Sequence, residues 1–242
     1  MATTPPAFTG FGRKTQSFLK DLDANNTREW FAENKPRYES EFVAPALAFI
    51  AAMEPRLETI SRQFMAIPAK QGGSLMRIYR DVRFSKNKSP YKTNIGIHFR
   101  HELAKDVHAP GYYVHIQPPS VGNDYGMTGS MLGVGIWQPP PEALKAIRER
   151  IRDKPNDWLA ARDDKTFNKL LTIDGESLKR PPRGFDPEHP CIEDLKRKDF
   201  TAFKTLSVKD VSSAKLLETA EEAFSAAEPF MRFLCKAMGV EY

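Results

Sequence analysis

Residues 94–100, Asn-Ile-Gly-Ile-His-Phe-Arg, alternate apolar residues with polar residues or glycine. A period of two is typical of a β-strand that packs one face on a core and turns the other face away. Similar patterns occur at 75–84, 112–117 and 131–137, where Gly, Pro, Asn or Ser bounds each segment. Parallel pairing would need a crossover helix between consecutive strands, whereas these connections are short or polar. We therefore predict an antiparallel meander of about four or more strands.

The chain before this sheet has the 3.6-residue period of helices. A first helix is predicted from Thr15. A second begins at Asn26, a good N-cap residue with Glu29 three positions later, as in a capping box. Its apolar stripe restarts after Pro36 and continues to about Ile60.

The helical period returns after the sheet, where the prolines at 139–141 open a helix. Short helical pieces are predicted within 158–171, and a longer helical stretch covers 212–238 with a break at Pro229. Helices therefore precede and follow a central sheet. This order predicts the α+β class, with helices from the N- and C-terminal thirds packed on an antiparallel sheet.

Composition places the chain among globular proteins, with 40% hydrophobic and 28% charged residues in 242. We expect one domain over 1–242, with 1–12 as an N-terminal extension that docks through Phe8 and Phe11. The sequence shows neither a signal-type apolar region nor an apolar run long enough for a membrane span, so we expect a cytoplasmic protein without a membrane partner. Cys191 and Cys235 have no metal-ligand spacing, so we predict no metal and no cofactor.

The alternation divides each predicted strand into two faces. One face is aliphatic, whereas the other carries polar residues and two glycines: Arg77, Asp81, Arg83, His98, Tyr113, His115, Gln117, Gly133 and Gly135. Glycines in a strand often mark the close approach of a ligand or of another backbone. The polar face is therefore either a binding face or a polar sheet surface that needs no function.

Positive charge is concentrated at the start of the sheet. Seven Lys or Arg residues lie between Arg77 and Arg100, where Asp81 is the only acid, and the whole chain has a net charge of +5. Short hydrogen-bond donors alternate with these cations, which suits an oxyanion. Lysines in a hairpin loop can equally keep a protein soluble or protect a sheet edge. The predicted ligand-binding residues are Arg77, Arg83, Ser85, Lys86, Lys88, Tyr91, Lys92 and Tyr113.

Two residues of the polar face are candidates for catalysis. If Asp81 approaches His98, its carboxylate could orient the imidazole for general acid or base chemistry. Asp81 could instead form structural ion pairs with neighbouring arginines. No GxxxxGK[ST], GxGxxG or GxSxG motif occurs, so whether the protein is an enzyme stays open. Arg80 falls on the apolar side, where we expect a buried structural arginine paired with an acid such as Glu29.

The segments 25–31 (NNTREWF) and 77–86 (RIYRDVRFSK), with the Lys88-Ser89-Pro90-Tyr91-Lys92 run that follows, resemble an uncharacterised bacterial and fungal family, domain of unknown function 2461. Residues 182–186 and 189–190 also match its pattern. The resemblance covers nearly the whole chain and implies one intact domain, but no activity. It marks ten motif residues without roles: Asn26, Trp30, Arg77, Arg80, Asp81, Arg83, Ser85, Lys88, Tyr91 and Lys92.

Three functions fit these observations. The first is binding of a phosphorylated or otherwise anionic small molecule on the polar face, with hydrolase-type acid–base chemistry as an option. The second is a nucleic-acid-binding module, in which the cations follow a phosphate backbone and aromatic residues stack on bases. The third is a structural or interaction protein whose basic hairpin docks an acidic partner.

Overall fold

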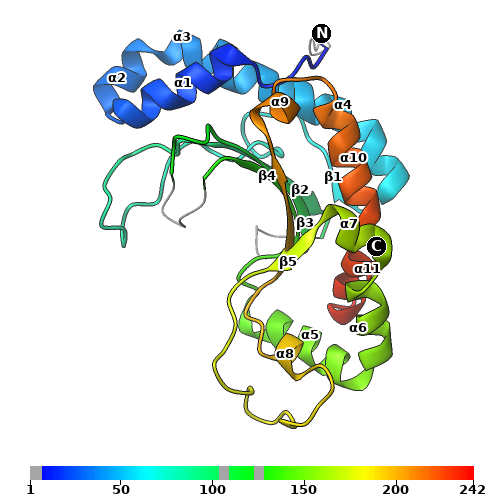
Figure 1. The fold of residues 1–242 in the computed structure, drawn as a ribbon. Coiled ribbons are helices and arrows are strands. Elements are labelled where there is room, and N and C mark those ends of the chain that lie inside the picture. The colour runs from blue at the N-terminus through cyan, green and yellow to red at the C-terminus, as the bar shows by residue number, and fades with distance from the viewer. Residues whose placement is uncertain (1–6, 104–108, 123–127) are drawn as a thin grey trace.

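The structure is a computed structural model that describes residues 7–103, 109–122 and 128–242. Its centre is a curved, fully antiparallel sheet of six strands in the order β1-β2-β3-β4-β6-β5 (Figure 1). The strands are β1 (Phe64–Met65), β2 (Ile95–His101), β3 (Gly111–Ile116), β4 (Ser130–Ile136), β5 (Thr172–Asp174) and β6 (Phe200–Leu206). The predicted α+β class with a central antiparallel sheet is confirmed.

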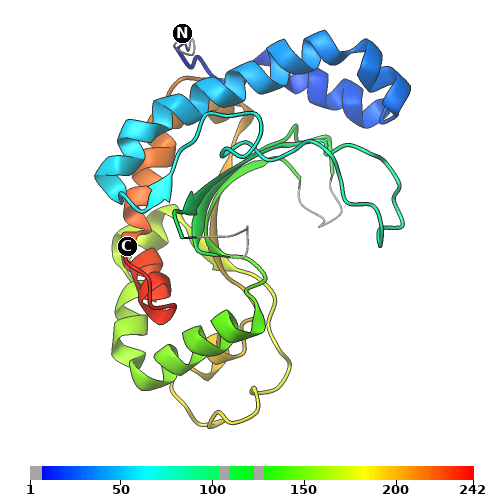
Figure 2. The same ribbon diagram turned by 180° about the vertical axis from the view of Figure 1, so that it is seen from behind.

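Helices precede and follow the sheet in the chain. They are α1 (Arg13–Ala24), α2 (Arg28–Glu33), α3 (Lys35–Arg37), the π-helical η1 (Tyr38–Val43), α4 (Ala44–Ile60), α5 (Pro141–Asp153), α6 (Pro155–Arg162), α7 (Lys165–Leu170), α8 (Ile192–Leu195), α9 (Val208–Val211), α10 (Leu216–Ala226) and α11 (Glu228–Ala237). Figures 1 and 2 show α4, α10 and α11 on one side of the curved sheet, while segment 77–93 projects on the other side. Among the described residues, no helix has the length and apolarity of a membrane span.

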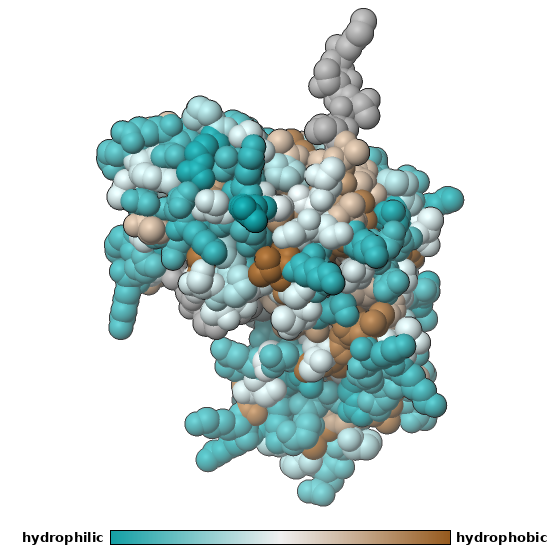
Figure 3. All heavy atoms as spheres, turned by 45° about the horizontal axis from the view of Figure 1, so that its top comes forward, coloured by the Kyte–Doolittle hydropathy of each residue, from teal (hydrophilic) through white to brown (hydrophobic). Residues whose placement is uncertain are grey.

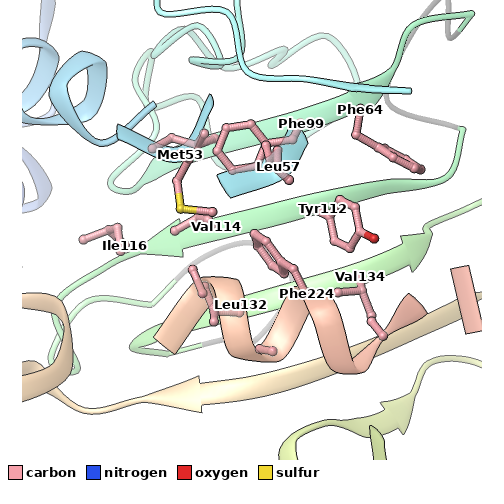
Figure 4. Packing of buried hydrophobic residues seen from close by; sticks show 14 of the residues in the cluster. Met53, Leu57, Phe64, Phe99, Tyr112, Val114, Ile116, Leu132, Val134 and Phe224 are labelled. Carbon is pink, nitrogen blue, oxygen red and sulfur yellow. The ribbon is translucent and has the colours of Figure 1, made fainter. Parts of the chain in front are cut away.

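The aliphatic face of the sheet forms the core with these helices. Phe99, Val114 and Leu132 are fully buried, as the alternation predicts. Figure 4 shows Met53 from α4 and Phe224 from α10 packed against this face. Burial of these large side chains is the main contribution to folding stability, at about 25 cal/mol per Å² of apolar surface.

Three of the four predicted strands are confirmed as β2, β3 and β4. The prediction of a strand at 75–84 is wrong, because this segment makes only isolated bridges, Leu75 with Ile97 and Tyr79 with Tyr91. The sequence reading missed β1, β5 and β6. β1 and β5 have two and three residues, too few to show a period.

Segment 77–93, which we call the arm, is an irregular hairpin. At its base Met76 N–H donates to the carbonyl of Gly96. Further out Lys92 N–H donates to the carbonyl of Ile78, and the pairing register has shifted by two residues. This shift interrupts the expected alternation, so the faces predicted for 75–84 do not hold. The alternation predicted Met76 on the aliphatic face and Gly96 on the polar face. In the structure the two are neighbours, and the sulfur of Met76 lies 3.0 Å from the place that a Cβ of Gly96 would occupy.

The helical N-terminal part follows the prediction with one correction. The N-cap of α2 is Thr27, whose hydroxyl accepts a hydrogen bond from the N–H of Trp30, and not Asn26. The restart at Pro36 is confirmed, since this residue lies in the first turn of α3, from which η1 and α4 continue. Phe8 and Phe11 are buried as expected, whereas residues 1–6 of the predicted extension lie outside the described residues.

Candidate functional site

The second face of the sheet carries polar residues and glycines. It differs from the predicted polar face, because the residues of 75–84 do not belong to the sheet. From here on the polar face consists of Asn94, Gly96, His98, Tyr113, His115, Gln117, Gly133 and Gly135. Cross-strand register places His98 opposite Tyr113, and Tyr113 opposite Gly133. Gly96 is opposite His115 in the adjacent row. The helices α4 and α10 pack on the aliphatic face (Figure 4), whereas the arm lies on the side of the polar face (Figure 1).

A chain of hydrogen bonds crosses the polar face. The amide nitrogen of Gln117 lies 3.1 Å from the carbonyl oxygen of Gly122, and its amide oxygen lies 2.8 Å from Nε2 of His115. On the other side of the imidazole, Nδ1 lies 3.1 Å from the hydroxyl of Tyr113 and 3.3 Å from the amide nitrogen of Asn94. His115 and Gln117 are buried.

The direction of every bond in this chain follows from one backbone carbonyl. The carbonyl of Gly122 can only accept, so it fixes the amide of Gln117 with its oxygen toward His115. That oxygen accepts from Nε2–H, which leaves Nδ1 of the neutral imidazole as an acceptor for Tyr113 and Asn94. Burial lowers the pKa of His115, although the hydrogen bond to Gln117 opposes this effect, so the neutral form is favoured.

His98 is buried more deeply than a solvated sheet face would require. Its side chain is 8% exposed, and within the described part of the chain its Nδ1 has no hydrogen-bond partner. Burial, together with the charge of Arg100, lowers its pKa to about 4. The ring lies over Gly111, where a Cβ would come within 2.3 Å of Nε2. The glycine is therefore required by the imidazole that covers it.

The two glycines of β4 have a similar explanation. A Cβ on Gly133 would lie 3.2 Å from the ring of Phe203, and one on Gly135 would lie 2.0 Å from the backbone oxygen of Phe200. Gly135 also has a φ of +108°, which other residues rarely adopt. The close approach of another backbone, one of the two expected reasons, accounts for Gly135, whereas Gly133 faces the side chain of Phe203.

Two cations lie together at the root of the arm. Lys92 is partly buried, and its pKa is lowered first by burial and then by the positive charge of Arg77. The neighbouring Tyr91 is buried and stacks on Phe31 of α2, whereas Lys92 stays partly exposed. Asn94, two residues after Lys92 in the chain, bonds to His115 of the polar face. Within the described residues, neither Arg77 nor Lys92 pairs with an acid.

The outer arm does not bring the predicted catalytic pair together. The carboxylate of Asp81 binds Arg83 at 2.6 Å, and both side chains are exposed, whereas His98 is buried in β2. The hydrogen bonds to Arg83 lower the pKa of Asp81 to about 2. Asp81 and His98 make neither a hydrogen bond nor an ion pair with each other, so the alternative of a structural ion pair describes the geometry.

Other motif residues hold the arm in shape. The guanidinium of Arg80 donates to the carbonyl of Ser89 at 2.9 Å and to the hydroxyl of Ser85 at 3.3 Å. The ammonium of Lys88 donates to the carbonyl of Val82. Arg80 is half-buried, and in these two bonds it contacts neutral groups of the arm, whereas the prediction paired a buried Arg80 with an acid such as Glu29. Ser85 and Lys88 also bond within the arm.

The inner end of the arm is attached to the helical lobe. Both side-chain atoms of Asn26 bond to the backbone of Tyr91. Trp30 packs on Phe18 of α1, with 6.0 Å between the ring centroids. Asn26 and Tyr91 therefore attach the arm to the lobe, and Trp30 contributes to the packing of the lobe itself. Tyr91 is buried, which sets it apart from the other predicted ligand-binding residues.

Sequence reasoning placed His115 and Gln117 on the polar face but did not include them among the site residues. Their spacing at i and i+2 in one strand was the available signal, because it puts both on one face. Among the described residues, no group of three or more His, Cys, Asp or Glu side chains is placed to hold a metal ion. A hollow of about 280 Å³ between α7 and β5–β6 lies at the opposite edge of the sheet and includes none of the predicted residues.

These features define an α+β protein with a buried histidine network on one sheet face and a basic arm at the edge of that face. The chain belongs to the family of conserved hypothetical proteins called domain of unknown function 2461, whose model matches residues 14–233. Comparison with curated proteins and with solved structures gave no match.

Proposed function

We propose that the protein binds a small ligand with a phosphate or carboxylate group between the root of the arm and the polar face. The observation that carries this proposal is the pair Arg77 and Lys92, two neighbouring cations that pair with no acid of the described chain. Such a pair is unfavourable for folding, since like charges repel and burial disfavours the ammonium ion. A bound anion would screen the repulsion and compensate the buried ammonium ion with an opposite charge.

Neutral groups beside these cations suit an anion with polar substituents. Asn94 and Tyr113 are held in place through His115, and the buried amide of Gln117 fixes the imidazole behind them. Groups positioned in this way lose little freedom when a ligand binds. The hydrogen bond from Tyr113 to a neutral imidazole also supports acid–base chemistry, because His115 could take up a proton through the tyrosine hydroxyl.

Thermal unfolding with inorganic phosphate and with malonate, against chloride at equal ionic strength, tests the proposal. A ligand at 100 times its dissociation constant stabilises the folded state by about 2.7 kcal/mol, which is a clear shift of the unfolding temperature. We expect stabilisation by at least one of these anions, and its loss in Arg77→Ala and in Lys92→Met. The double variant Lys86→Gln with Lys88→Gln, which removes the same kind of charge from the outer arm, should keep it.

Two results would contradict this proposal. The first is equal stabilisation of wild type and Arg77→Ala by the same anion, which would place the binding elsewhere. The second is the absence of any anion-specific shift for both probes at concentrations up to tens of millimolar.

A further inference from the structure

The whole net positive charge of the chain lies in one segment. The residues from Arg77 to Lys92 include six Lys or Arg and one Asp, so their net charge equals the +5 of the full sequence. All other residues together contain equal numbers of basic and acidic side chains. Charge that serves solubility alone is normally spread over the surface with both signs mixed. Its concentration in one projecting arm favours a polyanionic partner.

A large aromatic side chain lies beside this charge. Phe84 is 95% exposed in the outer arm. The guanidinium carbon of Arg83 lies 5.9 Å from the centre of its ring, within the range of a cation–π contact. An almost fully exposed phenylalanine buries no apolar surface within the fold, so packing does not explain it. The hydrophilic side chains that dominate the left of Figure 3, where the α1–α3 lobe and the arm lie, make an exposed aromatic residue there more unusual.

The outer arm presents this ring on an ordered support. Arg80 and Lys88 bond to the carbonyls of Ser89 and Val82 and thereby close the loop from within. Asp81 binds Arg83 through both carboxylate oxygens, which sets the guanidinium next to the ring. Phe84, Arg83 and Lys88 therefore have contacts that position them before any partner arrives, which lowers the entropic cost of binding.

We propose that the outer arm binds single-stranded nucleic acid, with Phe84 stacked on an unpaired base and Arg83, Lys86 and Lys88 at backbone phosphates. An exposed aromatic ring among cations is the combination that single-strand binding sites use, because every base offers a flat face and every linkage offers a charge. An acidic protein would be attracted by the same cations but would not require a stacking surface. This binding is separate from the small-anion site and does not depend on it.

Fluorescence anisotropy with a labelled oligothymidylate of about 12 nucleotides measures this binding directly. Phe84→Ala should weaken binding about tenfold or more, and Phe84→Trp should retain it. If three phosphates are neutralised, affinity should fall about 20-fold between 50 and 200 mM salt. Phe84 is exposed, so its substitution should leave the unfolding midpoint unchanged, which separates a binding defect from a folding defect.

A matched pair of charge variants tests the location. Lys86→Gln with Lys88→Gln should reduce affinity several-fold. Lys165→Gln with Lys169→Gln, on the exposed side of α7, removes the same net charge and should not reduce it. Arg77→Ala should lose phosphate binding yet keep oligonucleotide binding through the outer arm, so the two proposals can fail independently.

Several outcomes would overturn the inference. Equal affinity for an abasic oligomer of the same length would exclude base stacking. Binding of duplex DNA as tight as that of the single strand would do the same, since its bases are paired and stacked. Equal losses in the α7 control would show a general charge effect, and no binding at about 50 mM salt would exclude the nucleic acid altogether.

Discussion

Asn26 binds the backbone of Tyr91 through both ends of its side-chain amide: Oδ1 accepts from the N–H at 3.1 Å, and Nδ2 donates to the carbonyl at 3.0 Å. This pair joins the turn between α1 and α2 to the root of the arm, 65 positions away in the chain. Asn26→Asp keeps an acceptor but directs a carboxylate at the carbonyl. We expect a loss of about 2–3 kcal/mol in the free energy of unfolding, measured with urea.

The neighbouring Asn25→Asp is the control for that substitution, because Asn25 is exposed and its side chain donates only locally, to the carbonyl of Asp21 in the last turn of α1. It should change the free energy of unfolding by about 0.5 kcal/mol or less. Equal effects of the two substitutions would show that the bond to Tyr91 contributes little.

The bond between His115 and Gln117 predicts a strong coupling in a double-mutant cycle. Gln117→Leu leaves the buried Nε2–H of His115 without its partner, which should cost about 1–3 kcal/mol. Combining Gln117→Leu with His115→Leu removes both members of the buried pair, so the combined loss in urea unfolding should be smaller than the sum of the single losses. Strict additivity would contradict the network.

Lys92→Met should stabilise the protein while it weakens anion binding. The substitution keeps an unbranched, apolar stem and removes a partly buried charge next to Arg77. We expect a gain of about 0.5–1 kcal/mol in the free energy of unfolding without phosphate, as when a residue is retained for function at the expense of stability. Lys165→Met in α7, fully on the surface, should stay within about 0.5 kcal/mol of wild type. A destabilised Lys92→Met would contradict the role given to this lysine.

His98 makes folding stability depend on pH on the acidic side of neutrality. Its pKa is about 4 in the folded protein, whereas an unfolded histidine titrates near 6.5. Between these values the unfolded chain binds a proton that the folded chain does not, so stability is lost as the pH falls from about 7 toward 4. The contribution of this one group is roughly 2 kcal/mol between pH 7 and pH 5. In His98→Gln the difference in unfolding free energy between these two pH values should shrink accordingly, and an unchanged difference would contradict the assignment.

The fold was predictable where periodicity was strong. Val114 and Leu132 are buried as their alternation indicates, since an aliphatic face of a strand has no other stable environment. The prediction failed at segment 75–84. Its composition is that of a strand, but its backbone hydrogen bonds form two short pairings whose registers differ by two residues. The register of strand pairing depends on both strands, so it cannot be predicted from the sequence of one segment alone.

The site was predictable in its location more than in its parts. Charge density pointed to the arm, and alternation pointed to the polar face with His98, His115 and Tyr113. Sequence offered the pairing of Asp81 with a neighbouring arginine as one of two alternatives, and it could not indicate that the side chain of Asn26 bonds to the backbone of Tyr91, 65 residues away. Both residues are polar and belong to the same motif. Only their contacts in the structure show that they stabilise the arm and are not free to bind a ligand.

The placement of all net charge in one arm gives the molecule a permanent electric dipole. The remainder of the chain has no net charge, so the net charge that attracts an anion at long range is that of residues Arg77 to Lys92. An approaching anion would turn the molecule arm-first before any contact forms, so productive encounters would exceed those expected from the area of the arm alone. The arm thus sets the orientation of encounter as well as the contacts that follow it.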